Sequence, residues 1–256
     1  MADTPFILLT NDDGINAPGL SALYQEVNKI ADSKIVAPSV ECSGVGHGIT
    51  ILDPLRINEI HSNGSFYGYA VGGTTADCVK TAVFSLFEEK PDVVISGINL
   101  GPNTGINMFY SGTVSGAAEG AILGIPSFAI SLATFTNPDF TYAAKFARKF
   151  ADKIIDKKIP KGIFLNVNVP PCPEEQVKGI KVTSQGKAIY KEKYDERIDP
   201  FGRHYYWLTG HKIKQNRSLE IDESAVQADY ISITPLHIDM TNYNFISKLK
   251  EWDIVR

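Results

Sequence analysis

The chain contains little cysteine. Cys42, Cys78 and Cys172 are its three thiols, and no two of them have the C-x-x-C spacing of a metal-ligand pair. An odd number of cysteines without such spacing favours free, reduced thiols in a cytoplasmic protein.

The sequence also lacks a long apolar run. The run at residues 6–9 is too short for the core of a signal peptide or for a membrane span, and residues 1–5 carry no basic side chain. We therefore expect a cytoplasmic protein that does not bind a membrane.

An excess of positive charge is absent as well. Lysine and arginine number 25 against 29 aspartates and glutamates, which gives a net charge of −4. Binding to a nucleic-acid polymer needs a basic face that displaces phosphate counterions, so we expect no such partner. A single nucleotide is still an allowed ligand, because one small pocket suffices for it.

Several catalytic signatures are missing. No G-x-G-x-x-G follows the first apolar run and no G-x-x-x-x-G-K-[ST] occurs, which argues against a dinucleotide dehydrogenase and a P-loop NTPase. No two histidines stand four residues apart, so a histidine-rich zinc site has no support. His47 and His237 are weak candidates for proton transfer, because a lone histidine is more often structural. Cys42 lacks the partners of a catalytic nucleophile.

Short apolar runs alternate with segments of helical periodicity, which predicts an α/β protein with a doubly wound, mostly parallel sheet. Asn16 is the expected N-cap of the first helix, and Thr74 with Asp77 resembles a capping box. The expected strands cover residues 6–9, 35–37, 66–71, 93–95, 127–131, 164–169 and 230–233, and the expected helices cover 18–30, 75–87, 115–123, 140–154 and 243–249.

The character of the sequence changes after about residue 180. Residues 187–220 are charged and aromatic with few helical signals, which indicates an extended hairpin. No low-complexity linker and no internal repeat occurs. We therefore expect one domain over residues 1–256, with a core at 1–180 and a hairpin, a late strand and a terminal helix at 181–256.

Oxygen-bearing side chains follow two of the expected strands. Asp12 and Asp13 end the first strand, and Asn99 follows the strand at 93–95. Ligands of open α/β sheets bind beyond the carboxyl ends of the strands. Two carboxylates this close repel each other unless a cation or a proton lies between them, and oxygen ligands suit Mg²⁺ or Mn²⁺. The alternative is an ordinary Asn-Asp-Asp-Gly turn.

Three glycine-bearing loops could bring backbone amides to a phosphate. They cover residues 43–46, 97–103 and 111–113, and the last of them precedes a helix whose N-terminus favours anions. Each loop is a weak signal alone, because glycine loops are common.

Seven ordered segments resemble the stationary-phase survival protein SurE family, and together they span nearly the whole chain. They are residues 10–14 with 17–19, 43–44 with 49–50, 73–79, 96–103, 110–114, 166–170 and 234–236.

The resemblance implies a metal-dependent nucleotidase with a Rossmann-like, three-layer α/β/α core. It implies one divalent cation per subunit, Mg²⁺ or Mn²⁺, with Asp12, Asp13, Ser43 and Asn99 as ligands. Asp12, Asp13 and Asn99 are also the expected catalytic residues. The substrate-binding positions that it implies are Ser43, Gly44, Asn103, Ser111, Gly112 and Thr113.

The resemblance further implies a homodimer or homotetramer, built through a swapped C-terminal element and the protruding hairpin. Two positions depart from the family pattern: Cys42 stands where many members carry arginine, and Thr75 stands where proline is common. The loss of an arginine near the phosphate bears on affinity or substrate choice rather than on the metal site.

The expected reaction is hydrolysis of nucleoside monophosphates to nucleoside and phosphate by a metal-activated water. 5′-Monophosphates are the expected substrates, with 3′-monophosphates and polyphosphate as further ones, and His237 is a weak candidate for protonating the leaving group. One rival is an aspartyl-phosphate mechanism, although that chemistry uses an Asp-x-Asp loop. The other is a nucleotide-binding regulator without turnover.

Overall fold

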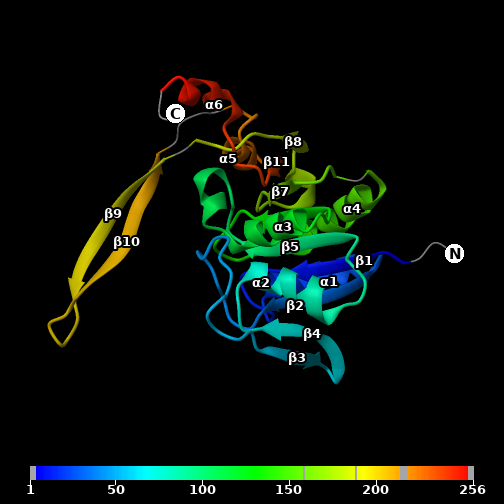
Figure 1. Ribbon diagram of the computed structural model, residues 1–256. Coiled ribbons are helices and arrows are strands. Elements are labelled where there is room, and N and C mark those ends of the chain that lie inside the picture. Colours follow the sequence, from blue (N-terminus) through cyan, green and yellow to red (C-terminus); the bar gives the residue numbers. More distant parts are fainter. Residues whose placement is uncertain (1–3, 158, 188, 214–217, 253–256) are drawn as a thin grey trace.

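The computed structural model describes residues 4–157, 159–187, 189–213 and 218–252 (Figure 1). The strands are β1 (Phe6–Thr10), β2 (Asp32–Pro38), β3 (Ile57–Ser62), β4 (Ser65–Val71), β5 (Val93–Leu100), β6 (Ser127–Leu132), β7 (Ile163–Val169), β8 (Ile180–Val182), β9 (Ile189–Ile198), β10 (His204–Ile213) and β11 (Ile231–His237). The α-helices are α1 (Pro18–Val27), α2 (Thr75–Thr81), α3 (Gly112–Ile122), α4 (Thr141–Lys157), α5 (Asp222–Gln227) and α6 (Tyr243–Lys250), and the shorter helical turns are η1 (Ala82–Leu86), η2 (Gly105–Phe109) and η3 (Glu174–Gln176).

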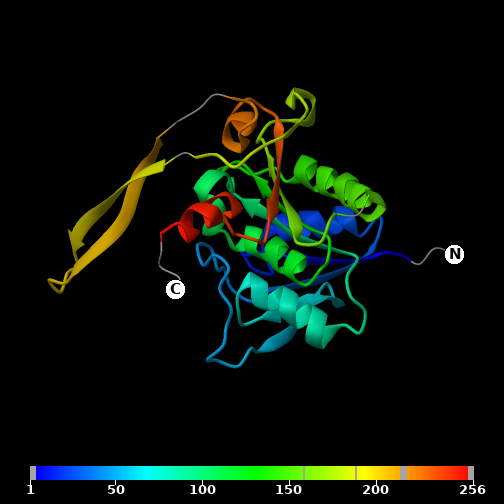
Figure 2. The ribbon, with the colours of Figure 1, turned by 45° about the horizontal axis from the view of Figure 1, so that its top comes forward.

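One sheet organises the molecule, with its strands in the order β3-β4-β2-β1-β5-β6-β7-β11-β8. The run from β4 to β7 is parallel throughout, while β3 lies antiparallel to β4 and β11 antiparallel to β7. The chain passes from β1 to β2 on one side and later returns to β5 on the other. The predicted doubly wound, mostly parallel α/β fold is confirmed (Figure 2).

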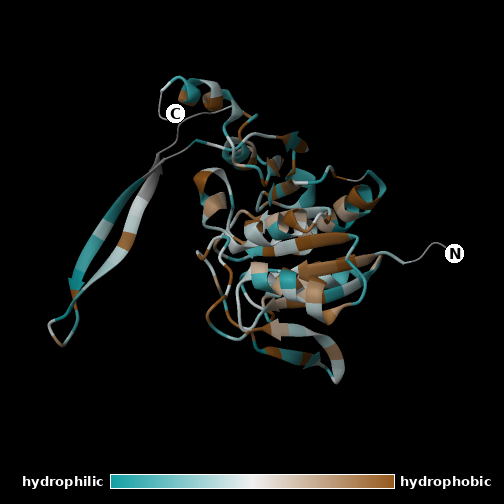
Figure 3. Ribbon diagram, in the orientation of Figure 1, coloured by the Kyte–Doolittle hydropathy of each residue, from teal (hydrophilic) through white to brown (hydrophobic). Residues whose placement is uncertain are grey.

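Helices cover both faces of this sheet. Helices α1 and α4 pack together over one face, and α2 and α3 pack together over the other. The central strands are the most apolar part of the ribbon in Figure 3, because they are buried on both faces. A three-layer arrangement therefore holds the carboxyl ends of β1 and β5 rigidly at one edge.

The predicted helix starts were partly right. The Thr74–Asp77 capping box is present, with each side chain bonded to the other residue's backbone amide. Asn16 was the wrong N-cap for α1: the cap is Ala17, without a side-chain bond, and Pro18 supplies the first helical position. The helix predicted over residues 75–87 ends at Thr81 and continues as the π-helical turn η1.

Two strands were not predicted, and β2, β5 and β11 are each at least three residues longer than predicted. Strand β3 is largely exposed and β8 has only three residues, so neither carries a buried apolar run. Strand β5 does not stop at Ile95 but extends to Leu100, with a register shift against β6 between Ser96 and Asn99. Asn99 is therefore the last residue but one of β5 and does not lie in a loop after the strand.

The predicted hairpin is formed by β9 and β10, which pair antiparallel with each other and project away from the sheet (Figure 1). Residues 188 and 214–217 of the predicted segment lie outside the described residues. The predicted terminal helix is α6, and its described side chains are exposed. No helix within the described ranges combines the length and the apolar character that crossing a membrane requires.

Candidate active site

A cleft of about 620 Å³ opens between the ends of β1 and β5. At this point the order of the strands reverses, since β2 lies on one side of β1 and β5 on the other. Such a reversal leaves a crevice at the carboxyl edge, which is where open α/β sheets bind ligands. The sequence places three polar loops around it. The lining residues include Asp12, Asp13, Glu41, Ser43, Gly44, Asn99, Leu100, Pro102, Asn103, Tyr110, Ser111, Phe135 and Phe140.

Asp12 is buried and its carboxylate faces the start of α3. The hydroxyl of Thr113 donates to Oδ1, and the backbone amides of Gly112 and Thr113 also bond to this carboxylate. Burial raises the pKa of Asp12, and these hydrogen bonds oppose the rise. The Asp12 carbonyl accepts from the amide of Cys42 at 2.8 Å, which ties the end of β1 to the next loop.

Asp13 is half-buried beside Asp12. Burial and then the negative charge of Asp12 raise the pKa of Asp13 to about 6, while a backbone hydrogen bond with Leu100 opposes the rise and Glu41 adds to it. A nearby cation would stabilise the charged form of a carboxylate whose pKa is raised by neighbouring anions. The electrostatics of this pair therefore fit a bound divalent ion.

Glu41 is a third carboxylate of the cleft, and sequence reasoning missed it. The hydroxyl of Ser43 donates to its Oε1 at 2.8 Å, and its charge acts on Asp13. The available signal was its position two residues before Ser43 at the edge of a glycine loop. It is recognisable only once the fold brings that loop to Asp12 and Asp13.

Asn99 is oriented by its own strand end. Its Nδ2 donates to the carbonyl of Gly101 at 2.7 Å, and the residue lines the cleft. With the amide nitrogen committed to the backbone, Oδ1 is the atom suited to bind a cation. A neutral oxygen ligand of this kind complements two carboxylates in a Mg²⁺ or Mn²⁺ site.

Asn103 is held in place by two buried asparagines of β7. Asn168 Oδ1 accepts from the Asn103 amide at 2.8 Å, and Asn166 Nδ2 donates to the Asn103 carbonyl at 2.7 Å. The Asn103 side chain in turn donates to the Ser131 hydroxyl at 3.0 Å. Asn166 and Asn168 thus fix the backbone of a cleft residue, a role that their place in the sequence did not reveal.

The start of α3 forms one wall of the site. Ser111 is its N-cap, accepts from the amide of Val114 at 3.1 Å, and lines the cleft. Thr113 is fully buried, with its hydroxyl bonded to Asp12 rather than open to the cleft. A Cβ on Gly112 would lie 2.6 Å from the Asp12 Cβ, so only glycine permits this approach.

The four expected metal ligands, Asp12, Asp13, Ser43 and Asn99, all line this one cleft. Among the described residues, no three of the types His, Cys, Asp and Glu gather as a metal-binding group. The expected set does not need one, because a hydroxyl and an amide supply two of its four oxygens. The donor chemistry suits a hard cation and not zinc.

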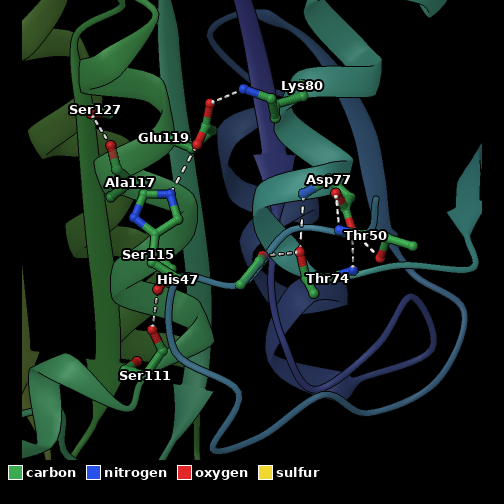
Figure 4. Close-up of polar contacts among 11 residues, drawn as sticks. His47, Thr50, Thr74, Asp77, Lys80, Ser111, Ser115, Ala117, Glu119 and Ser127 are labelled. Atoms are coloured by element: carbon green, nitrogen blue, oxygen red, sulfur yellow. Dashed lines mark hydrogen bonds and ion pairs between the residues drawn. The ribbon is translucent and has the colours of Figure 1, made fainter. Parts of the chain in front are cut away.

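Neither candidate histidine reaches the cleft. His47 pairs with Glu119 at 2.9 Å, and Lys80 approaches the same carboxylate at 3.0 Å (Figure 4). His237 ends β11 opposite Ile163, at the amino edge of the parallel strands and far from the carboxyl edge where the cleft opens. Within one subunit, His237 is therefore not placed to protonate a leaving group.

The two departures from the family pattern have defined contacts. The Cys42 sulfur lies 3.6 Å from the Gly73 carbonyl oxygen, and burial, then the charge of Asp12, raises the pKa of its thiol. This thiol stays protonated near neutral pH and is no activated nucleophile. The Thr75 hydroxyl donates to the Asn11 carbonyl at 3.1 Å, a bond that proline could not make.

Fold and site together define a doubly wound α/β protein with an acidic, oxygen-lined ligand site at the switch point of its sheet. The family model described as Survival protein SurE matches residues 7–192, and the chain belongs to this family. It is 47% identical to the 5′-nucleotidase SurE of Syntrophobacter fumaroxidans, over 97% of this chain and 99% of that protein.

Two further relatives support the assignment. The 5′-nucleotidase SurE of Syntrophus aciditrophicus is 53% identical over 95% of this chain and 92% of that protein. The crystal structure of the SurE protein from Aquifex aeolicus matches with a TM-score of 0.85 and 43% identity, covering 96% of this chain and 99% of that one. The family expected from the sequence motifs is confirmed.

We predict that Gly112→Ala destabilises the protein by about 1–3 kcal/mol, because the added methyl group overpacks the contact between α3 and Asp12. Urea denaturation measures the change. Gly72→Ala is the matched control, since a Cβ there would lie 3.6 Å from its nearest neighbour outside the adjacent residues, the Arg56 carbonyl oxygen. Equal stability of the two variants would contradict the prediction.

The buried Glu119 carboxylate predicts an acid-dependent loss of stability. Burial alone raises the pKa of Glu119, but the hydrogen bonds and charges of His47 and Lys80 outweigh it and leave the pKa below its ordinary value. Such a group stabilises the fold above the pKa that it has in the unfolded chain, about 4.3. That contribution is lost as the pH falls through the lower, folded value.

Glu119→Gln is therefore expected to weaken the pH dependence of the unfolding free energy below about pH 4.5, measured by urea denaturation at a series of pH values. Glu59→Gln, on the exposed strand β3, is the control and is expected to keep the wild-type slope. A Glu119→Gln curve parallel to the wild-type curve in acid would refute the assignment.

Proposed function

We propose that the protein is a 5′-nucleotidase that hydrolyses nucleoside 5′-monophosphates to nucleoside and phosphate with one divalent cation, Mg²⁺ or Mn²⁺. One observation carries this proposal: Asp12, Asp13, Ser43 and Asn99 converge on a single cleft at the switch point of the sheet. The names of the relatives from Syntrophobacter fumaroxidans and Syntrophus aciditrophicus, both 5′-nucleotidase SurE, support the same reaction.

The cation would be held by the two aspartates together with the Ser43 hydroxyl and the Asn99 amide oxygen. When bound, such an ion supplies a Lewis acid for the phosphoryl group and lowers the pKa of a coordinated water. The protein's own contribution is to fix these four oxygens. Hydrogen bonds from Thr113 to Asp12, from Ser43 to Glu41 and from Asn99 to Gly101 orient three of these side chains, and a backbone hydrogen bond with Leu100 orients Asp13.

In this proposal, neutral hydrogen-bond donors around the cation bind the phosphate. The cleft presents the Ser111 side chain at the start of α3, the Asn103 amide and the Gly44 backbone. A helix N-terminus favours an anion at that point. Gly112 and Thr113 act in this proposal through Asp12, since their amides bond to its carboxylate.

We also propose that the protein works as a homo-oligomer through the hairpin of β9 and β10. Both faces of this two-stranded ribbon carry exposed apolar side chains, among them Tyr194, Trp207 and Leu208. A two-stranded hairpin with two solvent faces is marginally stable alone. A second copy of the chain would bury these side chains, as it would those of the exposed helix α6.

Asp13→Asn is expected to lower kcat/KM for AMP at least about 100-fold with either Mg²⁺ or Mn²⁺, the scale of losing one charge-stabilising group in an active site. The reason is the removal of one of the two anionic ligands. Phosphate release is the measurement, with 3′-AMP and polyphosphate assayed in parallel. Asp32→Asn, at the exposed amino end of β2, is the control.

Near-normal turnover by Asp13→Asn would sink the metal assignment. A phosphoenzyme trapped on Asp12 would favour the aspartyl-phosphate rival instead. A wild-type protein that binds AMP but releases no phosphate, with or without added cation, would favour the regulator.

Leu208→Lys is expected to shift the molar mass measured by light scattering to a smaller assembly, because it places a charge in the exposed apolar surface of the hairpin. Glu192→Lys introduces the same residue at a position of β9 that is already charged, and is expected to leave the mass unchanged. A wild-type monomer, or an unchanged mass for Leu208→Lys, would contradict the role of the hairpin.

A further inference from the structure

The cleft is larger than a cation and a phosphate need, and apolar side chains line it as well as polar ones. The apolar lining comprises Leu100, Pro102, Tyr110, Phe135, Pro138 and Phe140. A pocket lined by both polar and apolar groups suits a ligand of the same mixed chemistry.

Phe135 is the unusual member of this group. It follows β6 in the loop before α4, and its side chain is 75% exposed although it lines the cleft. The buried Phe140 is accounted for by the core under α1 and α4. No such packing explains an exposed phenyl ring at the rim of a polar site.

The position of the Phe135 ring is set by the backbone beneath it. A Cβ on Gly101 would lie 2.3 Å from the ring atom Cε1, so the ring rests directly against this glycine. Gly101 has φ +107°, which side chains rarely adopt, and its amide donates to the Leu132 carbonyl at 2.9 Å. The ring and the strand end are thus in fixed contact.

The loop that carries Phe135 is also closed by its own hydrogen bonds. The Thr134 amide donates to the Leu132 carbonyl at 2.8 Å, the Thr134 hydroxyl donates to the Thr136 carbonyl at 2.8 Å, and the Thr136 amide donates back to that hydroxyl at 3.2 Å. Phe135 therefore lies in a tight, hydrogen-bonded turn. A ring fixed in this way loses little freedom when a ligand binds.

Gly101 links the ring to the metal site. The Phe135 ring contacts Gly101, and the Gly101 carbonyl accepts the hydrogen bond from Asn99 Nδ2. Only Leu100 therefore separates the proposed cation ligand Asn99 from the glycine that the Phe135 ring contacts. A substrate whose phosphate lies at Asn99 would extend its other end toward this ring.

We propose that Phe135 is the stacking platform for the base of the nucleotide; this rests on the proposed function. Every base has a π-face, so an exposed ring accepts purines and pyrimidines without reading their hydrogen-bonding edges. Tyr110, 59% exposed, is a second aromatic side chain that lines the cleft. The platform adds affinity for the nucleoside part and leaves the chemistry at the phosphate to the other residues.

The test compares AMP with ribose 5-phosphate, which has the same sugar phosphate without a base. Stacking on an aromatic side chain is worth about 1–3 kcal/mol per base, so Phe135→Ala is expected to lower kcat/KM for AMP about 5- to 150-fold, mainly through KM. The value for ribose 5-phosphate is expected to stay that of the wild type. Phe135→Tyr keeps a ring and is expected to restore AMP turnover.

Phe84→Ala is the matched control, because Phe84 is an exposed phenylalanine of η1 that does not line the cleft. An equal loss on both substrates would assign Phe135 a structural role and overturn the proposal. No loss on either substrate would overturn it as well.

Calorimetry with adenosine gives a second readout that needs no turnover. Adenosine binding that is weakened in Phe135→Ala and kept in Phe135→Tyr supports the platform, while unchanged binding overturns it. A wild-type protein that binds adenosine but hydrolyses neither phosphate would refute the proposed function and not the platform.

Discussion

The contact between Asp12 and the start of α3 is the interaction on which the site depends. Two carboxylates follow each other at the end of a buried strand, where their repulsion is poorly screened. The hydroxyl of Thr113 and the first amides of α3 take up part of the charge of Asp12. Asp13 has no such support from a helix and keeps a raised pKa, near 6. Both carboxylates therefore have a raised pKa, and a cation between them would favour the charged form of each.

Much of the fold could be predicted from the sequence, because its core strands are mostly apolar. Strands β1, β5, β6 and β7 are buried on both faces, and strands of this kind are recognisable in a sequence as short apolar runs. Strand β3 was not predicted because its side chains are largely exposed, and β8 was not predicted because it is only three residues long. The extension of β5 to Leu100 depends on its pairing with β6, a partner more than 25 residues away in the chain.

The site was predictable only where its residues share a short segment. Asp12, Asp13, Asn99 and Ser111 stand in motifs at strand ends or before a helix, and each motif can be read by itself. Glu41 and Phe135 could not be found in this way, because their roles arise from contacts with distant loops. Glu41 acts on Asp13 through space, and Phe135 rests on Gly101. Long-range packing, not local pattern, decides such positions.

The loop at residues 39–50 is held in a way that makes the proposed metal site independent of the side chain at residue 42, which is cysteine here and arginine in many family members. The Cys42 amide bonds to Asp12, so the backbone holds the loop at its start. Its far end is held by His47 on Glu119 and by Thr50 on Asp77 (Figure 4). Because these anchors lie on both sides of Ser43, the position of its hydroxyl does not rely on the side chain at residue 42. In the proposed site, a change at that residue would act on the charge that a phosphate meets, while Ser43 and Asp12 would keep their places.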